Sequence, residues 1–428
     1  MPTNIHINSI TGATPFNIYL CYSSNTSCVY IDTIPSSSLP YDFLVPSILE
    51  GELSYNLKVI DNNGCVFYQN VVIGSQPFIL KLTFDDIVNA DILVGDSTNI
   101  ADWNTFFDLP TNGNPFTTIL IIGNEVNLIG GSEIILIDGL FVYYDHLIKV
   151  EDSGSVITIM GTFEECDGIT EVSFNGCTQV FLGDASYGSF GYSTVVTANF
   201  PVCTYMESGF YDSNLVSIFA PLLEEAGNDC FASCNLTTID LPSLITAGNS
   251  CFNSCDSLTT ISLPSLIAAG NNCFNNCNSL TTISLSSLIT AGYGCFTSID
   301  SLTTVDLPQL TAAGDDCFNS CNSLTTISLP SLITAGYGCF NSCSLLTTIN
   351  LPVVQSIGYG AFASTILTTI NLSSCTDLGG TVGDDGVFDS IIGNTITLTI
   401  PAALMTCDGG NPDGDIQYLQ ANNTVTII

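Results

Sequence analysis

The chain has 428 residues, which is more than one compact core of ordinary size holds and suits two or three domains or an elongated repeat array. It carries 40 acidic residues against three lysines and no arginine, and no lysine follows Lys149. Because phosphate binding relies on Lys and Arg, this balance excludes a nucleic-acid partner and argues against an anionic membrane. It favours neutral glycans, cationic surfaces or surfaces bridged by divalent cations, unless the acidity serves only solubility in a saline medium.

Neither a membrane span nor a standard leader is expected. No run of about 18 apolar residues occurs, so we expect no membrane insertion. Residues 1–6 contain no basic n-region and no apolar h-region, so we expect no standard signal peptide.

Residues 1–76 differ in character from the rest of the chain. Alternating apolar and polar residues over 16–21, 27–31, 53–60 and 66–72, separated by turn-rich stretches, predict a small β-sandwich. The stretches S-I-T-G-A-T-P-F (9–16) and V-I-D-N-N-G-C (59–65) resemble the SprB-type immunoglobulin-like repeat of Bacteroidota surface adhesins. The resemblance implies an immunoglobulin-like module that ends near the Gln76-Pro77 step.

Residues 77–140 are expected to cap a repeat array and to form its degenerate first coils. Residues 99–107 have the apolar spacing of a helix, with Ser97 or Thr98 as the N-cap. This helix is expected to lay Trp103, the only tryptophan, across the first coil. The strand-like runs at 119–122 and 134–137 are interpreted as degenerate coils.

Residues 141–388 contain a repeat whose anchor is a phenylalanine. The steps between successive anchors are 22, 27, 20, 21, 21, 22, 22, 22, 22, 22 and 26 residues, and five equal steps in a row do not arise by chance. The anchors are Phe141, Phe163, Phe190, Phe210, Phe231, Phe252, Phe274, Phe296, Phe318, Phe340, Phe362 and Phe388.

Each position of a coil has a physical role. Leu258, Ile261 and Leu263 supply the apolar positions of a short strand, and alternation turns Thr260 and Ser262 outward. The segment around each anchor is too short for a stable isolated helix and is expected to form one helical or 3₁₀ turn that places the phenylalanine inside. Stacking at about 4.8 Å per coil then builds a parallel sheet.

The pattern G-x-x-x-F-x-x-C-x-x-L-T-x-I-x-L-P resembles the BspA-type leucine-rich repeat. The resemblance covers about two thirds of the chain and implies a right-handed solenoid used for adhesion, with no catalytic residues to transfer. One departure is Ala269 and its equivalents, where the family usually has isoleucine. The expected fold class is therefore mainly β, a leucine-rich-repeat solenoid behind a small N-terminal β-sandwich.

Residues 389–428 are expected to form the C-terminal cap, with strands at 395–401 and 423–428 separated by a polar loop. The loop gathers oxygen ligands and is a weak calcium candidate, although it does not match the twelve-residue EF-hand pattern. A plain capping loop is the alternative, and no other cofactor is expected. The candidate ligands are Asp408, Asn411, Asp413 and Asp415.

The chain has nineteen cysteines, and ten of them flank anchors as C-x-x-x-C at 230/234, 251/255, 273/277, 317/321 and 339/343. A zinc site needs further ligands, and these coils contain no histidine. Cysteine also packs well as a small apolar residue. We therefore expect buried reduced thiols and assembly in a reducing compartment, with disulfides and metal ligation as the alternatives.

No constellation of residues predicts an enzyme. The only histidines, His6 and His146, fall in different domains, and the chain lacks the arginines that clamp oxyanions and phosphates. Adjacent carboxylates on strands point apart, although a glycosidase with two carboxylates is not excluded by sequence. The adjacent pairs are Asp85/Asp86, Glu164/Glu165, Glu224/Glu225 and Asp315/Asp316.

The best binding candidate is the outward row of the strands, which is expected to form the concave face. Rigidly held hydroxyls, amides and carboxylates hydrogen-bond sugar hydroxyls at little entropic cost, whereas Thr and Ser also simply suit an exposed strand. A regular row of threonines could also suggest an ice-binding surface, but the ionised Asp residues of this row argue against that use. The row consists of Thr238, Asp240, Thr260, Ser262, Thr282, Ser284, Thr304, Asp306, Thr326, Ser328, Thr348 and Asn350.

The sequence therefore favours a non-enzymatic binding and display protein. The first hypothesis is an appendage of a phage or virus particle, such as a tail fibre, which contacts a glycan or protein on a host surface or other appendage subunits. The alternative is a bacterial surface adhesin or extracellular filament subunit. Both hypotheses place the protein on a virion surface or outside the cell, and both allow a homo-oligomer.

Overall fold

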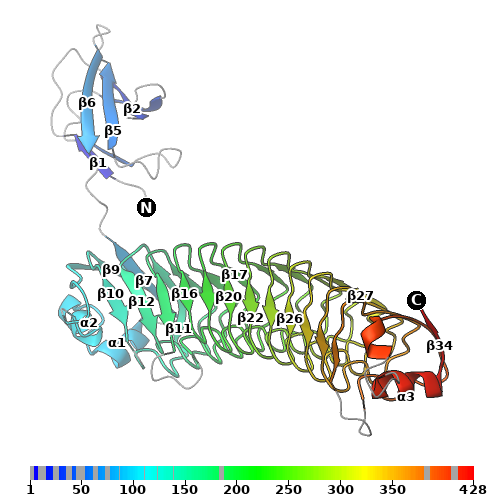
Figure 1. The fold of residues 1–428 in the computed structure, drawn as a ribbon. Coiled ribbons are helices and arrows are strands. Elements are labelled where there is room, and N and C mark those ends of the chain that lie inside the picture. Colours follow the sequence, from blue (N-terminus) through cyan, green and yellow to red (C-terminus); the bar gives the residue numbers. More distant parts are fainter. Residues whose placement is uncertain are drawn as a thin grey trace. The chain divides into compact units, whose positions relative to one another are not determined.

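The computed structural model describes residues 78–428 except 86, 110, 123, 138, 183–187, 380–385 and 406–412, and, within residues 1–77, the backbone of the strands. The chain divides into two compact units, Met1–Pro77 and Phe78–Ile428. Each unit is a separate body (Figure 1).

The first unit contains two antiparallel sheets. One has the strand order β3-β2-β5-β6, and the other pairs β1 with β4. The four strands of the larger sheet fall on the four alternating segments of the sequence, whereas the immunoglobulin-like assignment stays a prediction. The strands are β1 (Asn4–Ile7), β2 (Phe16–Tyr22), β3 (Cys28–Ile34), β4 (Tyr41–Leu44), β5 (Ser54–Ile60) and β6 (Val66–Val72).

The second unit begins with a cap that differs from the one expected. Residues 119–122, interpreted above as a degenerate coil, belong to a strand that pairs antiparallel with its neighbour, so they continue the sheet rather than wind as a coil. The order β8-β9-β7-β11 is antiparallel throughout. The cap elements are β7 (Ile79–Phe84), α1 (Val88–Val94), α2 (Ile100–Phe106), β8 (Thr118–Ile122) and β9 (Glu125–Ile129).

Helix α2 covers the open end of the coil stack. Asn99, rather than Ser97 or Thr98, is its N-cap, and its side chain accepts a hydrogen bond from the Ala101 amide. Trp103 is fully buried, as expected, and its indole N–H donates to the Ser97 carbonyl at 3.0 Å. Phe106 of this helix packs edge-on against Phe141, the first anchor.

The rest of the unit is a mainly β solenoid, which confirms the expected fold class. Each coil contributes one strand to a face that carries the L-T-x-I segments, here called the ladder face (Figure 1). Its strands are β11 (Leu147–Asp152), β13 (Glu171–Phe174), β15 (Thr197–Asn199), β17 (Ser217–Phe219), β19 (Thr238–Asp240), β21 (Thr260–Ser262), β23 (Thr282–Ser284), β25 (Thr304–Asp306), β27 (Thr326–Ser328), β29 (Thr348–Asn350), β31 (Thr369–Asn371), β33 (Thr395–Thr399) and β34 (Thr424–Ile427).

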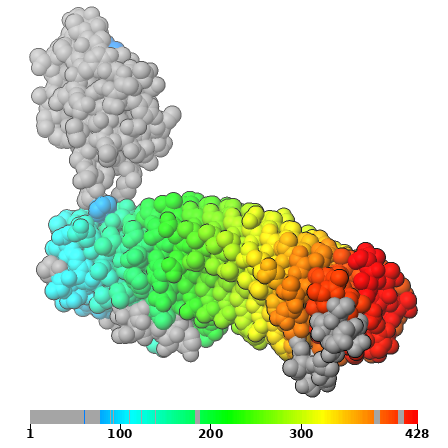
Figure 2. Space-filling view, viewed as in Figure 1, coloured from blue at the N-terminus to red at the C-terminus, as the bar shows by residue number. Residues whose placement is uncertain are grey.

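A parallel sheet of twelve strands forms another side of the coils, here called the alanine face because an alanine points inward from six successive strands. Colour follows sequence along the body in Figure 2, since successive coils lie side by side. The strands are β10 (Ile134–Leu136), β12 (Val156–Met160), β14 (Gln179–Phe181), β16 (Tyr205–Met206), β18 (Glu225–Ala226), β20 (Thr246–Ala247), β22 (Ala268–Ala269), β24 (Thr290–Ala291), β26 (Ala312–Ala313), β28 (Thr334–Ala335), β30 (Ser356–Ile357) and β32 (Asp377–Leu378).

The anchor phenylalanines form one continuous column inside the solenoid. All twelve are buried, and neighbouring rings from Phe141 to Phe362 are nearly parallel, with centroids 4.8 to 6.0 Å apart. Offset stacking at this distance is a favourable arrangement of aromatic rings. The column is the core around which both sheets close.

The segment around each anchor is a turn, not the helical or 3₁₀ turn that was expected. At eleven of the twelve anchors, the residues two before and two after the phenylalanine have positive φ, as Ser250 (φ 53°) and Ser254 (φ 56°) do around Phe252. A residue with positive φ cannot continue a right-handed helix. Two such residues per coil therefore reverse the chain on either side of the buried ring.

The C-terminal cap contains a helix where a polar loop was expected. It consists of β33, a 3₁₀ helix (Ala402–Met405), α3 (Gly414–Asn422) and β34, which pairs parallel with β33. Asp413 caps α3 by accepting a hydrogen bond from the Asp415 amide, and Ile416 and Leu419 are buried. The helical spacing of Ile416 and Leu419 is not evident from the sequence, because the neighbouring Gly, Asn and Pro residues indicate a loop.

Candidate binding surface

The row of side chains predicted from alternation lies in register on the ladder face. Ten of the twelve candidate side chains are exposed, and Thr348 and Asn350 are half-buried. Backbone pairing places like positions opposite one another, for example Thr282 beside Thr304 and Ser284 beside Asp306. The same holds for Thr238/Thr260, Asp240/Ser262, Thr326/Thr348 and Ser328/Asn350.

The first threonine of each T-T pair has a different role from the second. Thr259 Oγ1 donates to the Thr237 carbonyl of the preceding coil at 3.1 Å, and Thr303 and Thr347, two and four coils further on, make the same bond. These hydroxyls tie coils together. Most of the first threonines are also exposed, so they belong to the surface as well as to the contact between coils.

Side chains of the second column hold one another in place. Ser284 Oγ donates to Asp306 Oδ2 at 3.3 Å, and Asn350 Nδ2 donates to Ser328 Oγ at 2.9 Å. Asn371 Nδ2 donates to Asn350 Oδ1 at 2.6 Å. Contacts between coils thus orient the polar groups before any ligand arrives, which lowers the entropic cost of binding.

Three apolar side chains interrupt this polar surface on β15 and β17. Val196 and Val216 stand where later coils have the first threonine, and each is 37% exposed. Phe219, in the column of Asp240, is 57% exposed. The sequence indicates this difference, because these two coils lack the T-T pair. The predicted row, however, includes only the coils that follow.

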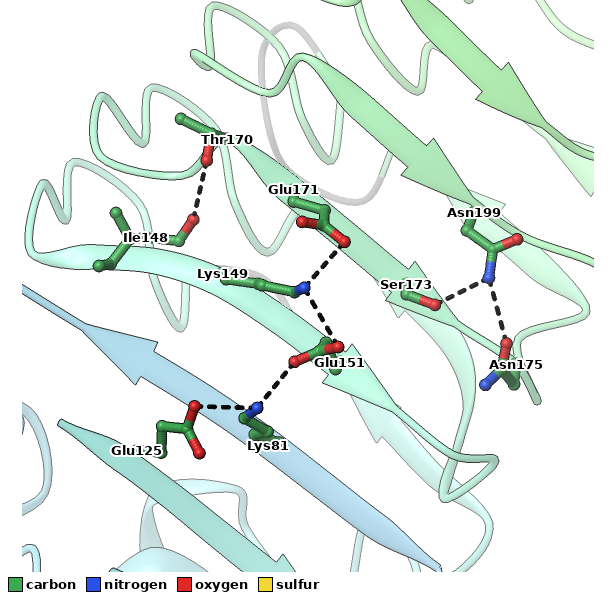
Figure 3. A network of polar contacts seen from close by, with 10 residues as sticks. All are labelled: Lys81, Glu125, Ile148, Lys149, Glu151, Thr170, Glu171, Ser173, Asn175 and Asn199. Atoms are coloured by element: carbon green, nitrogen blue, oxygen red, sulfur yellow. Dashed lines mark hydrogen bonds and ion pairs between the residues drawn. The ribbon is translucent and has the colours of Figure 1, made fainter. Parts of the chain in front are cut away.

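An ion-pair network lies at the N-terminal end of the ladder face (Figure 3). Lys81 Nζ contacts Glu125 at 3.0 Å and Glu151 at 3.1 Å, and Lys149 Nζ contacts Glu151 at 3.2 Å and Glu171 at 2.9 Å. Burial alone would raise the pKa of Glu151, but hydrogen bonds from both lysines lower it. Both described lysines are thus matched to carboxylates.

The weak calcium candidates do not converge in the part of the chain that is described. Asp413 caps α3, and Asp415 Oδ1 accepts a hydrogen bond from the Val387 amide at 2.7 Å. Burial raises the pKa of Asp415 to about 6. Asp408 and Asn411 lie outside the described residues, so calcium binding stays a prediction.

No group of three or more His, Cys, Asp or Glu side chains that could hold a metal ion occurs among the described residues. The adjacent pair Asp315/Asp316 diverges: Asp315 accepts from the Tyr337 amide at 2.7 Å and Asp316 from Asn319 Nδ2 at 2.8 Å. His146 Nδ1 lies 3.0 Å from Asp85 Oδ2 at the surface. Each of these groups thus has a local structural partner.

Fifteen of the nineteen cysteines are described, and all fifteen are buried and unpaired. Several thiols bond to the preceding coil: the Sγ atoms of Cys255, Cys277 and Cys343 each donate to an anchor carbonyl at 3.1 Å. Burial raises the pKa of Cys343 to about 12. A thiol in this state is protonated at neutral pH and is a poor metal ligand.

Comparison with known proteins identifies the repeats. Residues 204–309 and 268–382 match the family described as "BspA type Leucine rich repeat region", in six copies. No curated protein matches the sequence. None of the helices in the described parts of the chain has the length and apolar character that a membrane crossing requires.

Several solved structures are similar in part. A leucine-rich repeat protein from Bacteroides ovatus is 17% identical, with a TM-score of 0.39, over 73% of this chain and 91% of that one. One from Eubacterium ventriosum is 14% identical, with a TM-score of 0.35, over 83% and 96%. A leucine-rich cell surface protein from Faecalibacterium prausnitzii is 15% identical, with a TM-score of 0.31, over 62% and 87%.

The register of the coils, the column of anchors and the family match over residues 204–382 agree on one assignment. This part of the chain matches the BspA-type leucine-rich repeats.

Proposed function

We propose that the protein is a non-enzymatic binding protein whose ladder face contacts a glycan or protein on a partner surface. The observation that carries this proposal is the in-register double column of hydroxyl, carboxylate and amide groups on β19 to β29, which is exposed except at Thr348 and Asn350. Its side chains are held by contacts between coils, so the surface is rigid in the unbound protein.

The charge of this surface restricts the classes of partner that it can bind. No lysine or arginine follows Lys149 in the chain, so an anionic polymer finds no counter-charge on the repeats. Neutral sugar hydroxyls match the alternating donors and acceptors of the row. A cationic protein surface is the second partner class, because Asp240 and Asp306 are both exposed.

We further propose that the protein works outside a cell, as a virion appendage such as a tail fibre, or alternatively as a bacterial surface adhesin or filament subunit. The first unit would then serve as an immunoglobulin-like attachment module. The buried thiols support folding in a reducing compartment, which favours the virion appendage. Neighbouring capsid or baseplate genes would support the first assignment, and a secretion gene cluster the second.

A glycan array, read with and without calcium, tests the proposal. We expect binding to neutral oligosaccharides and a loss of at least about tenfold in affinity in the Thr304→Ala/Asp306→Ala variant. Thr334→Ala, an exposed threonine on the alanine face, is the matched control and should bind as the unmodified protein does. Unchanged binding by the ladder-face variant would place the contact elsewhere on the molecule.

A further inference from the structure

Among the residues that the structure describes, strand β8 has a neighbouring strand on one side only and is the open edge of a seven-stranded sheet on the ladder face. It is the terminal strand of the order β17-β15-β13-β11-β7-β9-β8, and its residues T-I-L-I-I include no charge, proline or glycine. Natural edge strands are usually protected by such residues or by a covering segment, because their free backbone groups pair with other strands. β8 therefore has the chemistry of a strand that accepts a partner strand.

The backbone directions identify the residues that face the open edge. The Phe84 amide donates to the Asn124 carbonyl and the Gly130 amide to the Phe78 carbonyl, so even-numbered residues of β9 bond to β7 and odd-numbered ones to β8. Since Leu120 lies opposite Asn127, it faces β9. The amides and carbonyls of Ile119 and Ile121 therefore point to the open edge.

The side chains of β8 suit pairing with an identical strand. Leu120 and Ile122 on the outer face are 48% and 58% exposed, while Ile119 and Ile121 are half-buried, and Ile119 packs against the core. An antiparallel pair centred on Leu120 sets Ile119 opposite Ile121 of the second strand. This register joins the outward-pointing amides and keeps outer side chains beside outer ones.

Charge also favours a second copy at this end of the molecule. The chain has a net charge of −37, so most of its surface repels another copy. On the outer face of β8, β9, β7 and β11, however, Glu125 and Glu151 are balanced by Lys81 and Lys149. No other part of the ladder face has a lysine that offsets its carboxylates.

We propose that β8 is a dimer interface, at which β8 of a second copy of this chain pairs antiparallel across a two-fold axis with the two Leu120 side chains opposite one another. The seven-stranded sheets that run from β8 to β17 in the two copies then form one continuous sheet.

Sedimentation equilibrium of the full chain at physiological salt tests this interface. We expect a species of twice the chain mass of 45.3 kDa, present at concentrations on the order of 10 µM. Leu120→Lys and Leu120→Glu each place like charges together at the axis, so each should weaken dimerisation more than about tenfold. An equimolar mixture of the two variants should restore the dimer, because Lys then faces Glu. Ile267→Lys, which is 42% exposed near the alanine face, is the control and should dimerise normally.

Three outcomes overturn the proposal. The first is an unmodified protein that stays a monomer. This outcome includes a monomer whose β8 amide hydrogens exchange slowly with solvent because another part of its own chain covers them. The second is a Leu120→Lys variant that dimerises as well as the Ile267→Lys control. The third is a variant mixture that stays monomeric, which excludes the two-fold register. Thermal unfolding of each variant verifies that it is folded.

Discussion

Two positions of one coil require glycine for different physical reasons. Gly360 has a φ of +62°, and a Cβ placed there would meet nothing within 4 Å. A Cβ on Gly358, in contrast, would lie 2.4 Å from the Tyr337 amide nitrogen and 2.5 Å from the Gly336 carbonyl carbon of the preceding coil. The first position needs backbone freedom, and the second needs space between coils.

Alanine substitutions separate these two effects. Gly360→Ala should cost about 1 kcal/mol, which is the usual penalty for a left-handed residue with a side chain. Gly358→Ala should cost about 3 kcal/mol, because the coils must move apart. Urea unfolding of both variants measures the difference, and equal costs would show that the coils do not approach as closely as described.

The pH dependence of stability has an identifiable source in Asp415. Burial raises its pKa to about 6 in the folded protein, against an ordinary value of 3.8. The folded state therefore binds more protons than the unfolded state between these values, so stability rises as the pH falls from 6 towards 4. Asp152, whose pKa burial also raises to about 6, acts in the same direction.

Asp415→Asn tests this contribution, since its amide oxygen can still accept the hydrogen bond from the Val387 amide. We expect the variant to gain less stability than the unmodified protein between pH 6 and pH 4, because one of the titrating groups is gone. Thermal unfolding midpoints across this range measure the slope. Parallel slopes would assign the effect to other carboxylates.

Among the elements, the phenylalanine column was the most predictable feature and the alanine face the least. The anchor spacing and the alternation around Ile261 fix the register of the ladder face. The alanine face is built from strands of only two residues along most of its length, such as Thr246–Ala247, and two residues carry no detectable alternation. The antiparallel cap was missed because an apolar run such as Thr118–Ile122 suits either pairing direction.

The phenylalanine column predicts a steep cost for its loss. Phe274 is fully buried between Phe252 and Phe296, with centroids 5.2 and 5.6 Å away. Phe274→Ala should cost about 3–5 kcal/mol because it leaves a cavity that two rigid neighbours cannot fill. Phe274→Leu, which keeps most of the apolar volume, should cost less. Chemical unfolding compares the two, and equal losses would point to stacking rather than volume.

In the molecule as a whole, much of the candidate surface followed from sequence, and its exceptions did not. Outward positions follow from alternation once the period is known, so all twelve candidates lie on one face. Phe219 and the network around Lys81 depend on where individual coils depart from the repeat, which a consensus pattern does not represent. Asp415 is predicted from the sequence as a metal ligand because the sequence indicates a polar loop where α3 lies.

The thiols provide a measure of global unfolding. Fifteen of the nineteen cysteines are buried, which leaves Cys21, Cys28, Cys65 and Cys407 as the ones not described. We expect at most four thiols to react quickly with Ellman's reagent in the native protein and all nineteen after unfolding without reductant. More than four fast thiols would contradict the packing of the coils, and fewer than nineteen in the unfolded chain would reveal disulfides.

The coils from Cys251 to Gly338 have the same length and the same anchor positions. Each is held only by the coil before it and the coil after it. Removing or doubling one such 22-residue stretch leaves the new neighbours with matching strands, rings and hydrogen bonds. Unequal crossing-over within the coding sequence would thus lengthen or shorten the solenoid in equal steps of one coil, while both end caps stay intact. The length of the solenoid can therefore change during evolution without loss of the fold.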